Sequence, residues 1–176
     1  MFRTIAALAL ASATAHSSTT LLPTAPWWER ITVTISGDGK PQACRFESSL
    51  KPNTPQSCDV VGSEPAQVTA SSIGAKDQYT RITFERRFQP GSQPNADTLQ
   101  AGETLLGGQV MALGIDPQGQ VKSCKIVAQS GSMRPEYGCD EASAEHFQAS
   151  AANARTTSQR EGYMSIVVYG HSEHVV

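Results

Sequence analysis

The chain contains four cysteines, which fall into two pairs with nearly the same spacing. Cys44 and Cys58 are 14 residues apart, and Cys124 and Cys139 are 15 residues apart. The second pair follows the first at an offset of 80 to 81 residues. A constant offset of this kind is typical of an internal repeat, in which one supersecondary unit occurs twice.

Each cysteine pair follows an apolar segment that ends in a glycine turn. The first copy reads Ile-Thr-Val-Thr-Ile-Ser-Gly-Asp-Gly over 31–39, and the second reads Val-Met-Ala-Leu-Gly-Ile-Asp-Pro-Gln-Gly over 110–119. The final glycines, Gly39 and Gly119, are again 80 residues apart. We therefore expect the same strand and turn at the start of each copy.

The repeat also predicts how the cysteines pair. Four cysteines allow three connectivities, and the repeat favours Cys44–Cys58 and Cys124–Cys139, one bridge within each copy. A closed loop of about 15 residues stabilises a fold by roughly 3 kcal/mol in the chain-entropy model. No two cysteines have the C-x-x-C spacing of a structural zinc site, so we predict no metal ligands among them.

The first residues have the pattern of a secretory signal peptide. A positive Arg3 precedes an apolar stretch over 5–13, and Ala13-Thr14-Ala15 is a small-x-small cleavage site. The apolar stretch is too short for a spanning helix of roughly 20 residues, so we expect cleavage after Ala15 and no membrane span thereafter. Export to the periplasm or beyond agrees with paired cysteines. The formal net charge of −2 and 17% charged residues argue against a nucleic-acid partner.

The pattern of elements predicts an α+β protein made of two ββαβ repeats, each with a small antiparallel sheet, a short helix and one disulfide. We expect strands over 30–36, 43–48, 79–88, 109–115, 121–129 and 163–170, and a helix over 140–154. We expect this organisation along the chain: signal peptide 1–15, N-terminal extension 16–28, first repeat 29–88, linker 89–108, second repeat 109–170 and C-terminal tail 171–176.

The sequence carries no recognisable catalytic motif, nucleotide-binding loop or zinc-protease signature. The histidines are His16, His146, His171 and His174, and none stands in a ligand pattern beyond the i, i+3 pair at the C-terminus. We therefore predict a non-enzymatic protein with no catalytic residues, cofactor or metal.

One family has motifs that resemble those of the second copy. The segment Ile115-Asp-Pro-Gln-Gly-Gln-Val121 is followed by Cys124-Lys-Ile-Val127, by Ser130-Gly131 and by Cys139 before a short helix. This succession resembles the TonB C-terminal domain family, in the cysteine-containing form of some alphaproteobacteria. The resemblance covers roughly 108–170 and, more faintly, 29–88.

The resemblance implies recognition by strand addition. In that family the last strand pairs with a short extended peptide of an outer-membrane receptor, so that main-chain hydrogen bonds supply affinity. The partners implied here are envelope proteins, including TonB-dependent receptors, and a homo-oligomer is left open. The matching strand consists of Tyr163, Met164, Ser165, Ile166, Val167, Val168 and Tyr169.

Alternatives remain open at this point. The two copies could pair edge to edge and thereby consume their binding strands. The chain could instead be a secreted scaffold or inhibitor that binds through the loops 51–56 and 132–137, or an enzyme whose site assembles between the copies. The sequence also departs from the family, because it shows neither an inner-membrane helix nor a long proline-rich spacer, so force transduction does not carry over.

Overall fold

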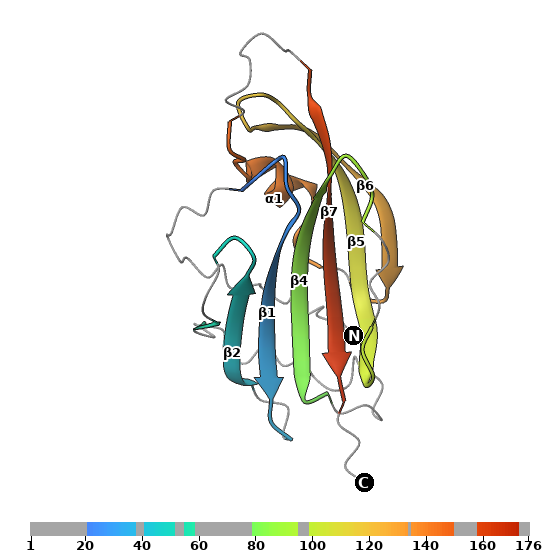
Figure 1. Cartoon of the computed structure of the whole chain (residues 1–176). Helices are drawn as coiled ribbons and strands as arrows, with labels where there is room; N and C mark the ends of the chain where they lie inside the picture. Colours follow the sequence, from blue (N-terminus) through green and yellow to red (C-terminus); the bar gives the residue numbers. More distant parts are fainter. Residues whose placement is uncertain are drawn as a thin grey trace, which may run out of the picture.

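The computed structural model describes residues 21–37, 41–51, 55–58, 79–94, 99–133, 135–149 and 158–172. These residues form one antiparallel sheet of seven strands in the order β3-β2-β1-β4-β7-β5-β6 (Figure 1). The strands are β1 Trp27–Ile35, β2 Pro41–Ser48, β3 Gln56–Ser57, β4 Arg81–Pro90, β5 Glu103–Ile115, β6 Val121–Gly131 and β7 Arg160–His171. The helix α1, Cys139–Ala144, lies between β6 and β7 in the chain.

The predicted α+β class with two ββαβ repeats is wrong. The described residues form a single sheet, because β4 and β7 pair along ten residues and join the two halves of the chain. The helix has six residues in place of the expected 140–154, and its C-cap Glu145 is already extended. Only Ala142 of α1 is buried. The segment therefore has no apolar stripe whose burial would stabilise a longer helix. The helix equivalent considered for the first copy, 58–70, lies almost entirely outside the described residues.

The two halves nevertheless contribute strands in the same order. β1 and β2 form a hairpin in the first half, and β4 pairs with the other side of β1. β5 and β6 form the matching hairpin in the second half, and β7 pairs with the other side of β5. The last strands of the two halves, β4 and β7, then meet near the centre of the sheet.

The strands predicted from alternating side chains are present, and several extend further than expected. β1 begins at Trp27, and β4 continues to Pro90. β5 begins at Glu103. The predicted linker over 89–108 is therefore wrong at both ends, because these residues continue the ladders of β4 and β5 against β7.

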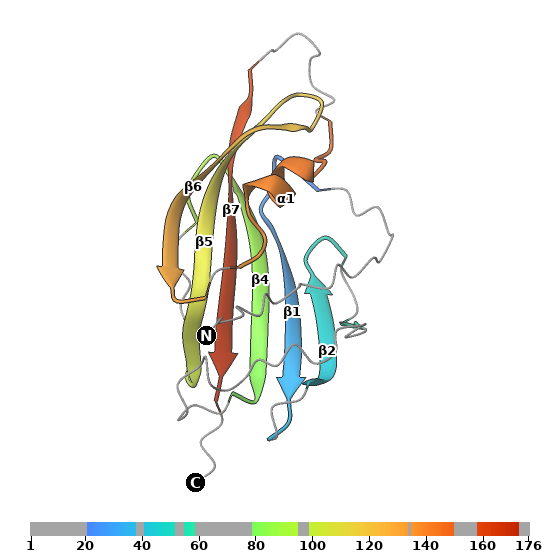
Figure 2. The ribbon, with the colours of Figure 1, turned by 180° about the vertical axis from the view of Figure 1, so that it is seen from behind.

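One face of the sheet is covered and apolar. α1 and the chain beside it lie across this face, which is turned toward the viewer in Figure 2. The core on this face is formed by aliphatic and aromatic side chains from both halves: Leu21, Trp27, Phe88, Met111, Leu113, Ile115, Val121, Ala142, Phe147, Met164 and Ile166. The opposite face of the sheet carries mainly polar and charged side chains over β1, β2 and β4.

Both predicted disulfides are confirmed, and the protein has no free cysteine. Cys44–Cys58 joins β2 to the residue after β3, and Cys124–Cys139 joins β6 to the first residue of α1. Two disulfides are typical of proteins from an oxidising compartment, either extracellular or periplasmic. The predicted signal peptide lies outside the described residues, and among the residues described no helix has the length and apolar character to cross a membrane.

Candidate functional site

The strand predicted to bind a partner lies in the middle of the sheet. β7 pairs with β4 on one side and with β5 on the other along almost its whole length. Its main-chain N–H and C=O groups therefore bond within the chain, and strand addition at 163–169 is not available in this fold. Met164, Ile166 and Val168 are buried, as befits a central strand. The two halves have paired edge to edge, which was the alternative considered for the sequence.

The open edge of the sheet is β6 instead. It pairs with β5 and stands last in the strand order. Isolated bridges occur at Gln120, just before β6 in the chain, and at Met133, just after it. Between these bridges, over 122–129, no described segment pairs with the outer side of β6. An edge strand directs alternate main-chain N–H and C=O groups into solvent, where they can template another strand.

The middle of β6 is apolar as well as exposed. Ile126 and Val127 are 41% and 43% exposed, which makes them two of the four exposed large hydrophobic residues in the described chain. Val127 is an extra residue in the ladder, because Val110 pairs with Ala128 while Met111 pairs with Ile126. β-Bulges of this kind are frequent at sheet edges and beside binding sites. Val127 is therefore presented to solvent outside the β5–β6 ladder.

Two lysines precede this apolar pair on the edge. Lys122 and Lys125 are both exposed, and Lys122 forms an ion pair with Asp116 at 3.4 Å. Lysines on an edge strand oppose uncontrolled pairing between copies of a protein. They also favour a partner that places an acidic side chain beside them. The edge thus combines an apolar segment with a positive end.

A disulfide and a short helix hold β6 in place. Cys124 bonds to Cys139, the first residue of α1. The helix begins with a main-chain N–H of Gly138 that donates to the carboxylate of Glu141 at 2.7 Å. This hydrogen bond lowers the pKa of Glu141 below its usual value, since it favours the charged carboxylate. The edge strand is therefore fixed to an element that packs on the core.

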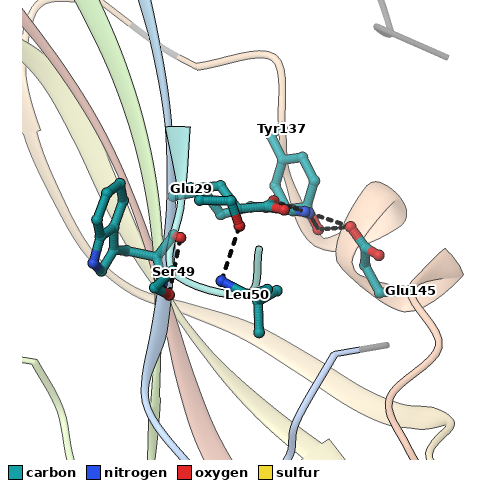
Figure 3. A network of polar contacts seen from close by, with 8 residues as sticks. Glu29, Ser49, Leu50, Tyr137 and Glu145 are labelled. Atoms are coloured by element: carbon teal, nitrogen blue, oxygen red, sulfur yellow. Dashed lines mark hydrogen bonds and ion pairs between the residues drawn. The ribbon is translucent and has the colours of Figure 1, made fainter. Parts of the chain in front are cut away.

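A polar network anchors the chain around α1 to the first half of the sheet. Arg86 of β4 forms ion pairs with Glu29 of β1 and with Glu145, and its N–H donates to the hydroxyl of Tyr137 at 3.1 Å. The Tyr137 hydroxyl in turn donates to Glu145 at 2.8 Å. Figure 3 shows Glu29, Tyr137 and Glu145 converging from separate elements. Arg86 also lies over the rings of Trp27 and Tyr137, at 5.3 Å and 5.2 Å from their centroids.

The pKa shifts of Arg86 and Tyr137 follow from their burial and from the charges around them. Burial opposes the charge of Arg86, but Glu29 and Glu145 outweigh it, so that the pKa of Arg86 lies above its usual value. Burial raises the pKa of Tyr137, and Glu145 raises it further. Tyr137 therefore stays neutral and donates a hydrogen bond. The predicted binding loop 132–137 thus ends in a residue that is engaged within the fold.

The remaining candidate residues do not form a catalytic group. His146 is exposed and makes an isolated bridge with Gln120, and His171 ends β7. His16 and His174 lie outside the described residues, as do residues 52–54 of the loop 51–56. Within the described ranges, no three His, Cys, Asp or Glu side chains gather as a metal site would require.

The open edge at β6 was not identified from the sequence because alternation identifies a strand but not its neighbours. The alternation over 121–129 predicted β6 correctly, but alternation by itself does not distinguish an edge strand from a central one. The available signal was Ile126 next to Val127, two large apolar residues in a row beside Lys125.

Comparisons with known proteins do not assign the chain to a family. No protein-family model, no curated protein and no solved structure matches it. The resemblance to the TonB C-terminal domain therefore stays a prediction from the motifs in the second half.

Proposed function

We propose that this chain is a non-enzymatic, exported binding protein that captures an extended peptide by strand addition at β6. The observation that carries the proposal is the outer side of β6 over 122–129, which no described segment pairs with. Strand addition supplies main-chain hydrogen bonds along the edge, and exposed side chains such as Ile126 supply selectivity. The compartment proposed is the periplasm, with the N-terminal segment acting as a cleaved signal peptide.

The chemistry of the edge indicates the kind of peptide. Ile126 and Val127 favour apolar side chains, and Lys122 and Lys125 favour an acidic residue near one end. The TonB-like motifs of the second half make the N-terminal segments of TonB-dependent outer-membrane receptors the first peptides to examine. The proposal moves the contact from the last strand, where that family makes it, to the other outer strand of the same half.

Two proline variants test the main-chain contact directly. Lys125 and Ile126 lie in the regular part of the β5–β6 ladder, between its two register shifts. Neighbouring residues of a regular antiparallel strand direct their N–H groups to opposite sides, so of Lys125→Pro and Ile126→Pro one removes an outward N–H and the other removes a ladder bond to β5. The variant with an outward proline keeps the melting temperature of the wild type but loses binding of fluorescent receptor peptides in an anisotropy titration. Normal binding by that variant would contradict strand addition at β6.

Photo-crosslinking gives a second, independent readout. A benzophenone amino acid at Ile126 should crosslink the bound peptide, whereas the same probe at Val167 of the central strand β7 should not. Crosslinking of peptide at Val167 but not at Ile126 would place the contact elsewhere. Failure of the oxidised protein to bind any receptor peptide or envelope segment would reject the proposed function as a whole.

A further inference from the structure

The polar face of the sheet contains a hollow of about 320 Å³, on the side away from α1. It is lined by residues of β2, β1, β4 and β7 and by Leu99, Gln100 and Glu103 just before and at the start of β5, whereas no residue of β6 lines it. Its volume is near the lower end for ligand sites in proteins. The lining contains four arginines and two glutamates, although the whole chain has a net charge of −2. A positive hollow in a mildly acidic chain is the feature that the binding edge does not explain.

The floor of the hollow is made by two threonines. Thr32 of β1 pairs with Thr83 of β4, and their hydroxyl oxygens lie 3.4 Å apart. Arg45 follows next to Thr32 on β2, and Tyr169 follows next to Thr83 on β7. The depression exists because two short side chains lie between two long ones in one row across the sheet. Two hydroxyl groups, each of which can donate, therefore meet at its base.

The row on one side of the threonines is internally neutralised. Glu85 of β4 is only 2% exposed, and it pairs with Arg30 at 2.7 Å and also with Arg87. The hydroxyl of Tyr169 donates to the same carboxylate at 3.4 Å. A buried carboxylate requires such partners. Because two guanidinium groups and a hydroxyl contact this one carboxylate, the side chains of the row are held in fixed positions.

The row on the other side contains Arg81 and, one strand beyond His171, Glu103. Arg81 lies on β4 two residues before Thr83, and its side chain faces the hollow and solvent. Among the described residues, no carboxylate lies within ion-pair distance of Arg81. Arg45, at the end of the threonine row, contacts Glu47 through one guanidinium nitrogen at 2.9 Å and keeps its other N–H donors. Two guanidinium groups with donors to spare therefore flank the two hydroxyls.

We propose that this hollow binds a small oxyanion, a carboxylate or a phosphate, over the Thr32–Thr83 pair. Arg81 and Arg45 provide the charge-assisted hydrogen bonds, because a planar guanidinium matches the oxygens of either group in a bidentate manner. The threonine hydroxyls bind the remaining oxygens, and the pair Arg30–Glu85 forms a fixed wall. The site is independent of β6, so that peptide binding and anion binding can be present or absent separately.

Titration of the oxidised full chain tests the proposal. Isothermal titration with inorganic phosphate, and separately with succinate, should show saturable binding, while sodium chloride at equal ionic strength should not. Arg81→Gln should weaken binding by about tenfold, the effect expected for one charge-assisted hydrogen bond. Lys125→Gln, which removes the same charge from the distant strand β6, should leave it unchanged.

Two variants of Thr83 test whether anion binding needs its hydroxyl group or only the shape of its side chain. Thr83→Val removes the hydroxyl, whereas Thr83→Ser keeps it; only the valine variant should lose affinity when both variants melt cooperatively. Binding of one anion class alone would still support the site and would identify its ligand. Absence of saturable binding by either anion, or equal weakening in Arg81→Gln and Lys125→Gln, would overturn the proposal.

Discussion

The two halves of the sheet contribute strands in the same order, yet they bury very different sets of side chains. Of the residues in the main core, the second half supplies Met111, Leu113, Ile115, Val121, Ala142, Phe147, Met164 and Ile166. The first half supplies Trp27 and Phe88 from its strands. The cause is the chain after β6, which carries α1 and crosses the covered face to reach Glu29 and Arg86. A shared strand order therefore does not produce shared packing.

The difference also separates the two outer edges. On the first-half side, β2 is followed by the two-residue strand β3 and by a disulfide at Cys58. On the second-half side, β6 has eleven residues, and no described segment pairs with its outer side over 122–129. The half with the deeper core thus also carries the longer open edge. A firmly held strand is what strand addition needs, because a partner then binds without ordering the edge first.

Loss of Arg86 should have a large effect on stability, because Arg86 makes an ionic contact between the halves. Arg86→Gln leaves Glu29 and Glu145 partly buried without their cation, so we expect a loss of about 3 kcal/mol in the free energy of unfolding. Arg45→Gln, which removes an exposed pair with Glu47, should cost about 0–1 kcal/mol. Urea denaturation of both variants measures the difference. Equal losses would mean that α1 is not tied to the first half through this network.

Removal of a disulfide should also lower stability, and the size of the loss should differ between the two halves. The two loops have nearly equal lengths, so chain entropy alone predicts about 3 kcal/mol for each. We expect the double serine variant at Cys124 and Cys139 to lose more than the one at Cys44 and Cys58, because only the former bridge joins an edge strand to α1 and the core. Thermal melting of both variants decides this. A larger loss from the first bridge would reverse the proposed asymmetry.

The contact between β4 and β7 depends on glycine, and its disruption should have a moderate effect. A Cβ atom at Gly162 would lie 2.5 Å from the ring of Phe88. Gly162→Ala should therefore force Phe88 aside and cost about 1–3 kcal/mol. Gly37→Ala is the matched control, since a Cβ there meets no atom within 4 Å. If calorimetry gives both variants the same melting temperature, close packing at the junction of the halves is not important for stability.

The smallest effect concerns pH and appears only in alkaline solution. Burial raises the pKa of Tyr137 in the folded protein above its usual value of about 10. The unfolded chain therefore loses this proton first as pH rises, so that the stabilising contribution is present below about pH 10 and is lost above it. Between about pH 8 and pH 11, the wild type should lose more unfolding free energy than Tyr137→Phe. Parallel pH profiles for the two proteins would argue against a buried, neutral Tyr137.

Local patterns were sufficient to predict the six longer strands and the disulfides, but not the short strand β3 or the length of the helix. The alternation of Ile31, Val33 and Ile35 reports which side chains share a face, and this depends only on the period of the strand. The cysteine spacing reports a short closed loop within each half, and both bridges are present. The helix was overestimated because the alanine-rich segment 140–154 has helix propensity but no apolar stripe, and propensity alone stabilises a helix only weakly.

The tertiary structure decided which strand lies beside which. β7 was predicted as a strand, but its place between β4 and β5 follows from pairings between residues far apart in the sequence. That pairing depends on aromatic rings of the first half packing over glycines of β7, Phe88 over Gly162 and Tyr79 over Gly170. The pairing of β7 with β4 and β5 placed the expected binding strand inside the sheet and left β6 as the edge. The pairing of β1 with β2 and with β4 brought Arg45, Thr32 and Thr83 into one row. The sequence by itself determined the strands, their faces and the disulfides, because these depend on local periodicity. The neighbours of each strand, and hence both proposed sites, depend on long-range contacts that no local pattern encodes.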